Sequence, residues 1–280
     1  MNKKIIFCIY LTLGVLLLLF NRQGEYAQVT ILDVGQGSGA YIKTDDGFEV
    51  LVDVGETNKT LRVLGSIRPW WDNHIDLMII SHADKDHAGM APRILRRFKI
   101  SNYIESPKIS QDGLSRTIRD ELVERKVNQM KTNPLDTITI SENTTLTFLS
   151  PSSSEANELN DNDASVIFIL SMYGKKFLFM GDASAEIEKE LAHRYSTLLD
   201  VDVLIVGHHG SKTSTSEDFL KVVNPEYAVI SLGQDNRYGH PHASVLDRLE
   251  KRGVSLLRTD THGTIQFRIK KEDDFDIVTK

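Results

Sequence analysis

The densest group of side chains able to bind a metal ion lies in residues 81–89. This segment places His82, Asp84, Asp86 and His87 within six positions. Imidazole nitrogens and carboxylate oxygens are ligands for Zn²⁺ and for harder divalent ions. The spacing therefore predicts a site for a pair of divalent ions. The alternative is an ordinary polar loop in which Asp86 helps to cap the next helix.

A strand before this segment and a helix after it would position the four side chains. Residues 75–80 form an apolar run typical of a buried strand, and apolar spacing predicts a helix over residues 88–98. A short loop between a strand and a helix can direct several ligand atoms toward one point. The chain as a whole alternates short strands with helices, which predicts an α/β fold.

The second half of the chain repeats part of the first. Residues 48–53 and 177–182 both begin with Phe and end with Asp, and residues 76–82 and 202–208 both begin with Asp and end with His. Two similar halves packed sheet to sheet would bring their strand ends to one edge. No linker separates the halves, so we expect a single domain. The repeat places four polar residues at strand ends: Asp53, His82, Asp182 and His208.

The first 27 residues read as a separate segment. Lys3 and Lys4 precede residues 5–20, an apolar run without a charged side chain. This pattern predicts a signal peptide or a membrane anchor, and the poor cleavage site around Ala27 favours the anchor. We therefore expect residues 28–280 to form an extracytoplasmic domain, either secreted or held at the membrane through residues 5–20.

Composition limits the classes of function. The 280 residues carry a formal net charge of −6, which excludes a generally basic coat for nucleic acid. The single cysteine, Cys8, lies in the apolar run, so no intramolecular disulfide supports the fold.

Six segments in order resemble the motifs of the metallo-β-lactamase-fold hydrolases, and most closely the extracytoplasmic hydrolase domain of the ComEC competence family. The chain has His-x-Asp-x-Asp-His where that fold usually has His-x-His-x-Asp-His. The matching segments are Leu32-Asp33-Val34-Gly35-Gln36-Gly37, Leu51-Val52-Asp53-Val54-Gly55, His82-Ala83-Asp84-Lys85-Asp86-His87, Met180-Gly181-Asp182-Ala183, Val206-Gly207-His208-His209-Gly210-Ser211 and Asn236-Arg237-Tyr238-Gly239-His240-Pro241-His242.

The resemblance implies a four-layer αββα sandwich of two similar halves with two divalent ions, Zn or Mn, at the shared edge. It implies that His82, Asp84 and Asp182 hold one ion. The second ion would be held by Asp86, His87, Asp182 and His208, and Asp53 would orient ligands from behind. The family usually supplies another His between the second motif and the bridging Asp. Here Asn162 or Asp163 could replace it through oxygen.

The mechanism expected from two such ions is in-line hydrolysis of a phosphodiester. Asp86 could accept the proton of the nucleophile, and His240 or His242 could donate one to the leaving oxygen. Backbone N–H groups at Ser211, with Lys212, could steady a phosphate. For both the His240 and the Ser211 segments, a purely structural turn is the alternative.

The function that the sequence favours is that of a metal-dependent phosphodiesterase or nuclease of ComEC-like type, with DNA as the expected partner. One alternative keeps the fold and changes the substrate, as in a phosphoesterase or lactonase on a small or cell-wall compound. Another is a non-catalytic DNA-capture protein in which the ions only stabilise the fold.

Two further features each allow a functional and a structural interpretation. Trp70 and Trp71 could stack on bases, but packing beneath the site loop is the preferred interpretation. A basic group follows the metal-binding segment and could attract a phosphate backbone, although a solvated helix face is the more common explanation. It consists of Arg93, Arg96, Arg97 and Lys99.

Overall fold

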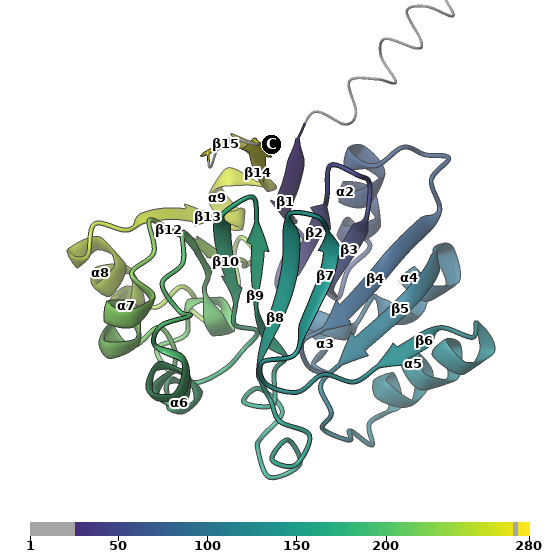
Figure 1. Cartoon of the computed structure of the whole chain (residues 1–280), viewed down its shortest axis with the longest axis horizontal. Coiled ribbons are helices and arrows are strands. Elements are labelled where there is room, and N and C mark those ends of the chain that lie inside the picture. Colours follow the sequence, from purple (N-terminus) through teal and green to yellow (C-terminus); the bar gives the residue numbers. More distant parts are fainter. Residues whose placement is uncertain (1–25, 271–273) are drawn as a thin grey trace, which may run out of the picture.

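Two β-sheets lie face to face at the centre of the protein, and helices cover the outer face of each (Figure 1). The computed structural model describes residues 26–270 and 274–280. Within these residues the layers follow the order helix, sheet, sheet, helix. The α/β sandwich expected from the sequence is confirmed.

The first sheet has eight strands in the order β15-β14-β1-β2-β3-β4-β5-β6. Strands β3 to β6 run parallel to one another, and the last strands of the chain return to pair beside β1. The strands are β1 (Ala27–Ile31), β2 (Gly39–Lys43), β3 (Glu49–Val54), β4 (His74–Ile80), β5 (Lys99–Glu105), β6 (Asn128–Met130), β14 (Ile265–Lys270) and β15 (Asp274–Thr279).

The second sheet has seven strands in the order β13-β12-β11-β10-β9-β8-β7. Its parallel part runs from β10 to β13, and β7 to β10 form antiparallel pairs. The strands are β7 (Thr137–Ser141), β8 (Thr144–Ser150), β9 (Ile167–Met172), β10 (Lys175–Phe179), β11 (Val203–Ile205), β12 (Tyr227–Ile230) and β13 (Ser255–Arg258).

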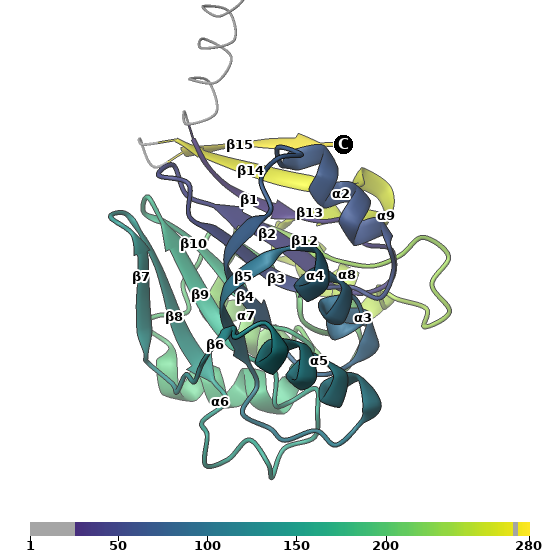
Figure 2. The ribbon, with the colours of Figure 1, turned by 90° about the vertical axis from the view of Figure 1, so that its right-hand side faces the viewer.

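Helices shield the outer face of each sheet (Figure 2). The first sheet packs against α2 (Lys59–Ile67), α4 (Ala91–Arg97) and α5 (Gly113–Glu124), and α3 (Lys85–Ala88) lies at its edge. The second sheet packs against α6 (Ala185–Tyr195), α7 (Glu217–Val223) and α8 (Ala243–Lys251). The remaining short helices are η2 (Gly207–Gly210) and α9 (Thr259–His262).

Three apolar cores hold the four layers together. Successive residues of a strand point to opposite faces, so Leu51 packs toward the helices while Val52 packs toward the other sheet. The core between the sheets is rich in aromatic rings, including Phe168 and Phe179, which stack with centroids 4.7 Å apart. Burial on both faces explains why these strands read as continuous apolar runs.

The internal repeat corresponds to two equivalent strand pairs. Strands β3 and β4 pair in parallel in the first sheet, and β10 and β11 do so in the second. Their carboxyl ends meet at one edge of the sandwich, where open α/β sheets commonly bind ligands. We call this edge the site edge. The opposite edge, where these strands begin, is called the entry edge because β1 begins there too.

The entry edge is where the described chain begins, at Tyr26 (Figure 1). β1 starts at Ala27, one residue before the boundary expected from the sequence. The apolar run of residues 5–20 lies outside the described residues. Among residues 26–270 and 274–280, no helix combines the length and apolar character that crossing a membrane requires.

Candidate metal centre

Asp53 and His87 form the base of a polar cluster at the site edge. The Asp53 carboxylate accepts hydrogen bonds from the Ser81 backbone N–H and hydroxyl, both at 2.8 Å. Its Oδ2 lies 2.8 Å from Nδ1 of His87. This contact assigns the Nδ1 proton to His87, so its Nε2 lone pair points away from Asp53 into the cluster. Carboxylates behind metal-binding imidazoles fix the tautomer in this way.

Asp182 follows β10 in a turn that needs glycine at position 181. Gly181 has a φ of +53°, and a Cβ there would lie 2.6 Å from the Ser165 side chain. The Ser165 hydroxyl accepts a hydrogen bond from the Asp182 N–H at 3.0 Å and lies 3.4 Å from Nδ1 of His82. Asp182 is buried, and its Oδ1 lies 3.1 Å from Nε2 of His87.

The turn η2 carries two adjacent histidines that face different surroundings. His209 is buried, and its Nδ1 donates to the Ser231 carbonyl at 2.8 Å. Its Nε2 then lies 3.3 Å from Nε2 of His87 and 3.2 Å from Oδ2 of Asp86. The His208 side chain is 28% exposed, and its Nε2 is 3.9 Å from Oδ2 of Asp182.

Both histidines have a φ of 52°, which is uncommon for residues other than glycine. Asp53 shares this left-handed backbone, with a φ of 49°. Such conformations cost free energy and concentrate at functional sites. Here they turn a carboxylate and an imidazole out of two different sheets toward the same point.

The residues present fit divalent metal ions. The Nε2 lone pairs of His87 and His209 face each other and two carboxylates, so these acceptors repel unless a cation or an added proton lies among them. Nε2 of His82 and Oδ1 of Asp182 are buried and accept no hydrogen bond. Two groups bring their ligand atoms within 4.8 Å of one another: His82, His87 and Asp182, and Asp86, His87 and His209.

The cluster keeps its carboxylates ionised. Burial opposes the charge of Asp182, but His87 and His209 outweigh it and hold the pKa of that carboxyl well below its usual range. Burial also opposes the charge of Asp86, yet when the added proton rather than a cation lies in the cluster, the hydrogen bond from protonated His209 and the charge of His87 lower its pKa to about 2. Two ionised carboxylates in a buried site favour a bound cation.

The predicted metal-binding segment occupies the loop after β4 and the first turn of α3. His82 is buried there, whereas the Asp84 side chain is half exposed with Oδ2 3.7 Å from Nε2 of His82. The loop after β1 packs closely over α3, because a Cβ on Gly37 would meet the Asp86 carbonyl at 2.0 Å. Asp84 therefore lies beside the ligand groups, and His82, Asp86 and His87 lie within them.

Among the described residues, Asp163 belongs to neither group of potential ligands, and the replacement of the missing ligand by Asn162 stays a prediction. The Asp163 carboxylate instead accepts from the Ser184 N–H at 2.9 Å, and the Asn162 carbonyl accepts from the Ser165 N–H at 3.1 Å. Through these contacts the two residues stabilise the turn before β9. Ser165 is the residue of this segment that contacts both His82 and Asp182.

The structure separates the two histidines predicted to donate a proton. His240 faces the cluster, with its ring centroid 6.5 Å from that of His209, and its Nδ1 is buried without a hydrogen-bond partner. Burial, together with the charges of His209 and His208, lowers the pKa of His240. His242 is exposed at the start of α8, where its Nδ1 accepts from the Ser244 N–H at 3.3 Å.

Ser211 and Lys212 follow η2 but are placed differently from each other. The Ser211 hydroxyl is buried and lies 3.0 Å from the Thr213 hydroxyl, and the Ser211 N–H donates to the His208 carbonyl at 2.8 Å. Ser211 thereby stabilises the turn that presents His209. Lys212 is exposed at the site edge, where a phosphate could reach it.

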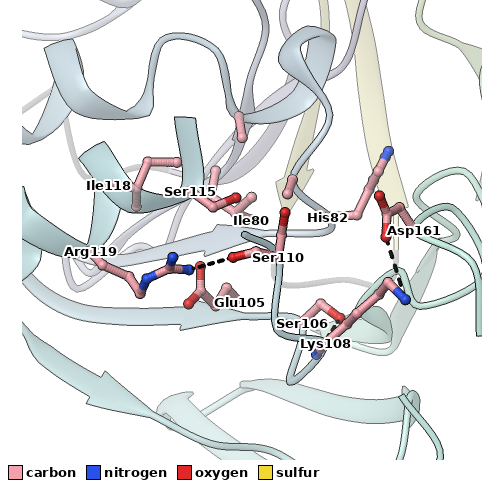
Figure 3. Close-up of a pocket in the computed structure, with 12 residues that line it drawn as sticks. Ile80, His82, Glu105, Ser106, Lys108, Ser110, Ser115, Ile118, Arg119 and Asp161 are labelled. Carbon is pink, nitrogen blue, oxygen red and sulfur yellow. Dashed lines mark hydrogen bonds and ion pairs between the residues drawn. The ribbon is translucent and has the colours of Figure 1, made fainter. Parts of the chain in front are cut away.

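A small pocket of about 30 Å³ lies beside His82 (Figure 3). α5, the end of β5 and the loops beside them form its walls, which combine apolar side chains with the carboxyls of Glu105 and Asp161 and the cations of Lys108 and Arg119. Arg119 donates to the Ser110 carbonyl at 3.0 Å, and Glu105 accepts from the Tyr103 hydroxyl at 3.0 Å. Burial raises the pKa of Glu105. The pocket is about the volume of one water molecule and lies next to a predicted ligand.

Sequence reasoning missed three residues of this site. His209 lies in the motif of residues 206–211, and the two adjacent histidines were the signal that either one could be the metal ligand. Ser165 and Ser231 carried no signal, because one contributes a hydroxyl and the other a backbone carbonyl.

Comparisons with known proteins agree with this geometry. The family model described as the metallo-beta-lactamase superfamily matches residues 32–234. ComE operon protein 3 of Bacillus subtilis is 29% identical, covering 92% of this chain and 35% of its own length. Competence protein ComA of Neisseria gonorrhoeae is 31% identical, and the match covers 86% of this chain and 32% of ComA. The chain thus spans about a third of the length of these relatives.

Solved structures share the fold at low sequence identity. CmlA, a diiron β-hydroxylase from Streptomyces venezuelae, is 13% identical with a TM-score of 0.58, covering 88% of this chain and 54% of its own. The metallo-beta-lactamase fold protein YhfI from Bacillus subtilis is 12% identical with a TM-score of 0.55, covering 86% and 99%.

Proposed function

The chain belongs to the metallo-β-lactamase superfamily, and from that premise we propose that it is a metal-dependent phosphodiesterase that cleaves DNA outside the cytoplasmic membrane. The convergence of His87, His209, Asp86 and Asp182 is the observation that carries the metal-dependent hydrolysis. The similarity of the chain to proteins named for competence supports DNA as the substrate.

The ligand set favours phosphodiester chemistry over the opening of a β-lactam. Asp86 and Asp182 add carboxylate oxygens to the nitrogens of His82, His87 and His209, and Asp84 lies beside them, which suits Zn²⁺ and also a harder ion such as Mn²⁺. Two divalent ions in such a site acidify water and neutralise charge on a phosphoryl oxygen. We propose that the site takes two ions, Zn or Mn.

The side chains of the cluster would bind and orient rather than exchange protons. Asp86, with a pKa of about 2, is a poor proton acceptor near neutral pH, so we assign it to holding a cation. Asp53 fixes the His87 ring, and the Ser231 carbonyl fixes the His209 ring. His240 has a lowered pKa and would be neutral, which allows it to donate a hydrogen bond to the departing oxygen.

The surface around the small pocket beside His82 would contact the substrate next to the scissile phosphate. Arg119 supplies the charge that a neighbouring phosphate requires. The pocket is open, so a polymer could continue past it into solution.

The test is metal-dependent hydrolysis by the full chain. Protein stripped with a chelator and reloaded with Mn²⁺ or Zn²⁺ is expected to cleave linear DNA and bis(p-nitrophenyl) phosphate, and His87→Ala is expected to abolish both activities. His193→Ala is the matched control, because His193 is exposed on α6 away from the cluster.

Three outcomes would change the proposal. Cleavage of the small diester without cleavage of DNA would point to another phosphoester. Hydrolysis of a lactone but of no phosphodiester would show that the protein is a lactonase and not a phosphodiesterase. Bound ions without turnover of any ester would leave a structural metal centre.

A further inference from the structure

Two adjacent tryptophans are among the most exposed large side chains of the described residues. Trp70 is 82% exposed and Trp71 is 52% exposed, and their rings meet edge to face with centroids 5.6 Å apart. They lie in the loop of residues 68–73, between α2 and β4. Neither ring packs beneath the metal-binding loop, so that expectation was wrong. An exposed aromatic pair of this size usually marks a binding surface.

The tryptophan loop lies at the entry edge, across the sheet from the metal centre. It precedes β4, whereas Ser81 and His82 follow it, and the seven residues of β4 span about 23 Å. Strand β1 runs in the same direction as β4, because β2 is antiparallel to both β1 and β3 and β3 is parallel to β4. The chain therefore enters the domain at the edge that carries the tryptophans (Figures 1 and 2).

The loop is fixed in place rather than loosely attached. Arg68 is buried, donates to Glu49 Oε2 at 2.8 Å and to the His74 carbonyl at 2.6 Å, and so anchors the start of the loop. The Lys99 N–H donates to the Asn73 carbonyl at 2.8 Å and anchors its end. Because such a loop is already ordered, its aromatic rings can bind another surface with little loss of conformational entropy.

Cations flank the loop on one side and acids on the other. Arg97 and Lys99 are exposed where β5 begins, next to β4, and Lys126 is exposed just before β6. Asp45 and Asp46 lie in the turn between β2 and β3 at the same edge. The mixed charges give the edge no strong field of one sign, so the aromatic pair distinguishes it.

We infer that this edge rests on a lipid bilayer, with Trp70 and Trp71 at the level of the head groups. Tryptophan is enriched at membrane interfaces because its ring is apolar and its N–H is polar. Only residues 21–25 separate the apolar run of residues 5–20 from Tyr26. Those residues can span at most about 18 Å, so an anchored domain is held near the membrane at this edge.

The chain contains no tryptophan besides these two, which makes them specific probes. Full-length protein in phosphatidylcholine vesicles is expected to show blue-shifted emission, and vesicles with brominated acyl chains are expected to quench most of it. Trp70→Phe and Trp71→Phe, each alone, report on the two rings separately. This readout does not depend on hydrolysis, so its failure is distinct from failure of the proposed function.

A tryptophan introduced at the site edge provides the matched control. Tyr238 is 56% exposed beside His240, and Tyr238→Trp in a background with both native tryptophans changed to Phe is expected to remain unquenched. Equal emission of the native pair in plain and brominated vesicles would overturn the inference. So would a full chain that does not float with the vesicles, or quenching of the Tyr238→Trp variant as strong as that of the native pair.

Discussion

The choice between two neighbouring histidines shows what single residues contribute to this site. His208 matches the position predicted from the family motif, but His209 is the one whose Nε2 faces His87 and Asp86. Because both residues adopt a left-handed backbone, their side chains leave the turn in different directions. A sequence shows two adjacent imidazoles without showing which one the turn directs inward.

The structure predicts different results for the two substitutions. His209→Ala is expected to lose bound metal and nearly all hydrolysis, because a buried nitrogen of a ligand group is removed. His208→Ala is expected to keep most of its metal, because that ring lies 3.9 Å from Asp182 and is partly exposed. Metal per chain measured by inductively coupled plasma mass spectrometry decides between them. A greater loss of metal from His208→Ala than from His209→Ala would show that His208, the position predicted from the motif, is the ligand.

Most of the remaining cluster could be predicted because it lies at strand ends. Asp53, His82 and Asp182 each follow an apolar run, and the repeat between the halves aligns them in the sequence alone. Asn162 was predicted as a replacement ligand only because of its position in the chain. Its role depends on how the turn before β9 folds, which no local pattern specifies.

At the scale of elements, the wall of the pocket depends on the start of α5. Asp112 caps this helix by accepting from the Leu114 N–H at 2.7 Å and the Ser115 N–H at 3.0 Å. Asp112→Ala is expected to lower the free energy of unfolding by about 1 kcal/mol, and Asp112→Asn is expected to retain most of it. Urea denaturation measures both values. Equal losses in the two variants would show that capping is not the cause.

The same cap gives a pH dependence of known sign. Slight burial opposes the charge of Asp112, but hydrogen bonds from Ser110 and Ser115 outweigh it and hold its pKa well below the ordinary 3.8. A carboxyl with a lowered folded pKa stabilises the fold above 3.8 and loses that contribution as the pH falls through the folded value. The stability difference between wild type and Asp112→Ala should therefore shrink in strong acid. A constant difference would contradict the assignment.

Element boundaries explain two expectations that the structure changed. The helix predicted over residues 88–98 begins only at Ala91 as α4, and the additional helix α3 precedes it, so Asp86 and His87 lie inside a short helix rather than in a loop. Trp70 and Trp71 were expected to pack beneath the loop that contains His82, twelve positions after Trp70. An extended strand separates them, and distance along a strand grows by about 3.3 Å per residue.

For the whole molecule, the sequence repeat predicted the paired sheets but not the order of the outer strands. β14 pairs with β1 across more than 230 positions, for example between Ile269 and Ala27. No local pattern specifies such a long-range pairing. The consequence is that β1 lies inside its sheet, between β14 and β2, although it directly follows the predicted anchor.

This arrangement predicts where the chain can be shortened. A protein that starts at Tyr26 keeps all three cores and the contact of Arg268 with the Tyr26 ring, so its thermal midpoint and its hydrolysis of a soluble diester should match the full chain. A protein that starts at Leu32 lacks β1 and is expected to aggregate. Circular dichroism and turnover per molecule test both. Equal stability of the two shortened chains would contradict the pairing.

The opposite placement of the tryptophan loop and the metal centre limits which diesters can be substrates. With the entry edge at the lipid surface, the length of β4 raises the cluster about 23 Å above the head groups. The phosphodiesters of the lipids beneath the anchored protein then lie beyond its reach. With the proposed placement at a bilayer, we therefore expect no phospholipase activity on that bilayer, whereas the centre would be open to chains that approach from solution.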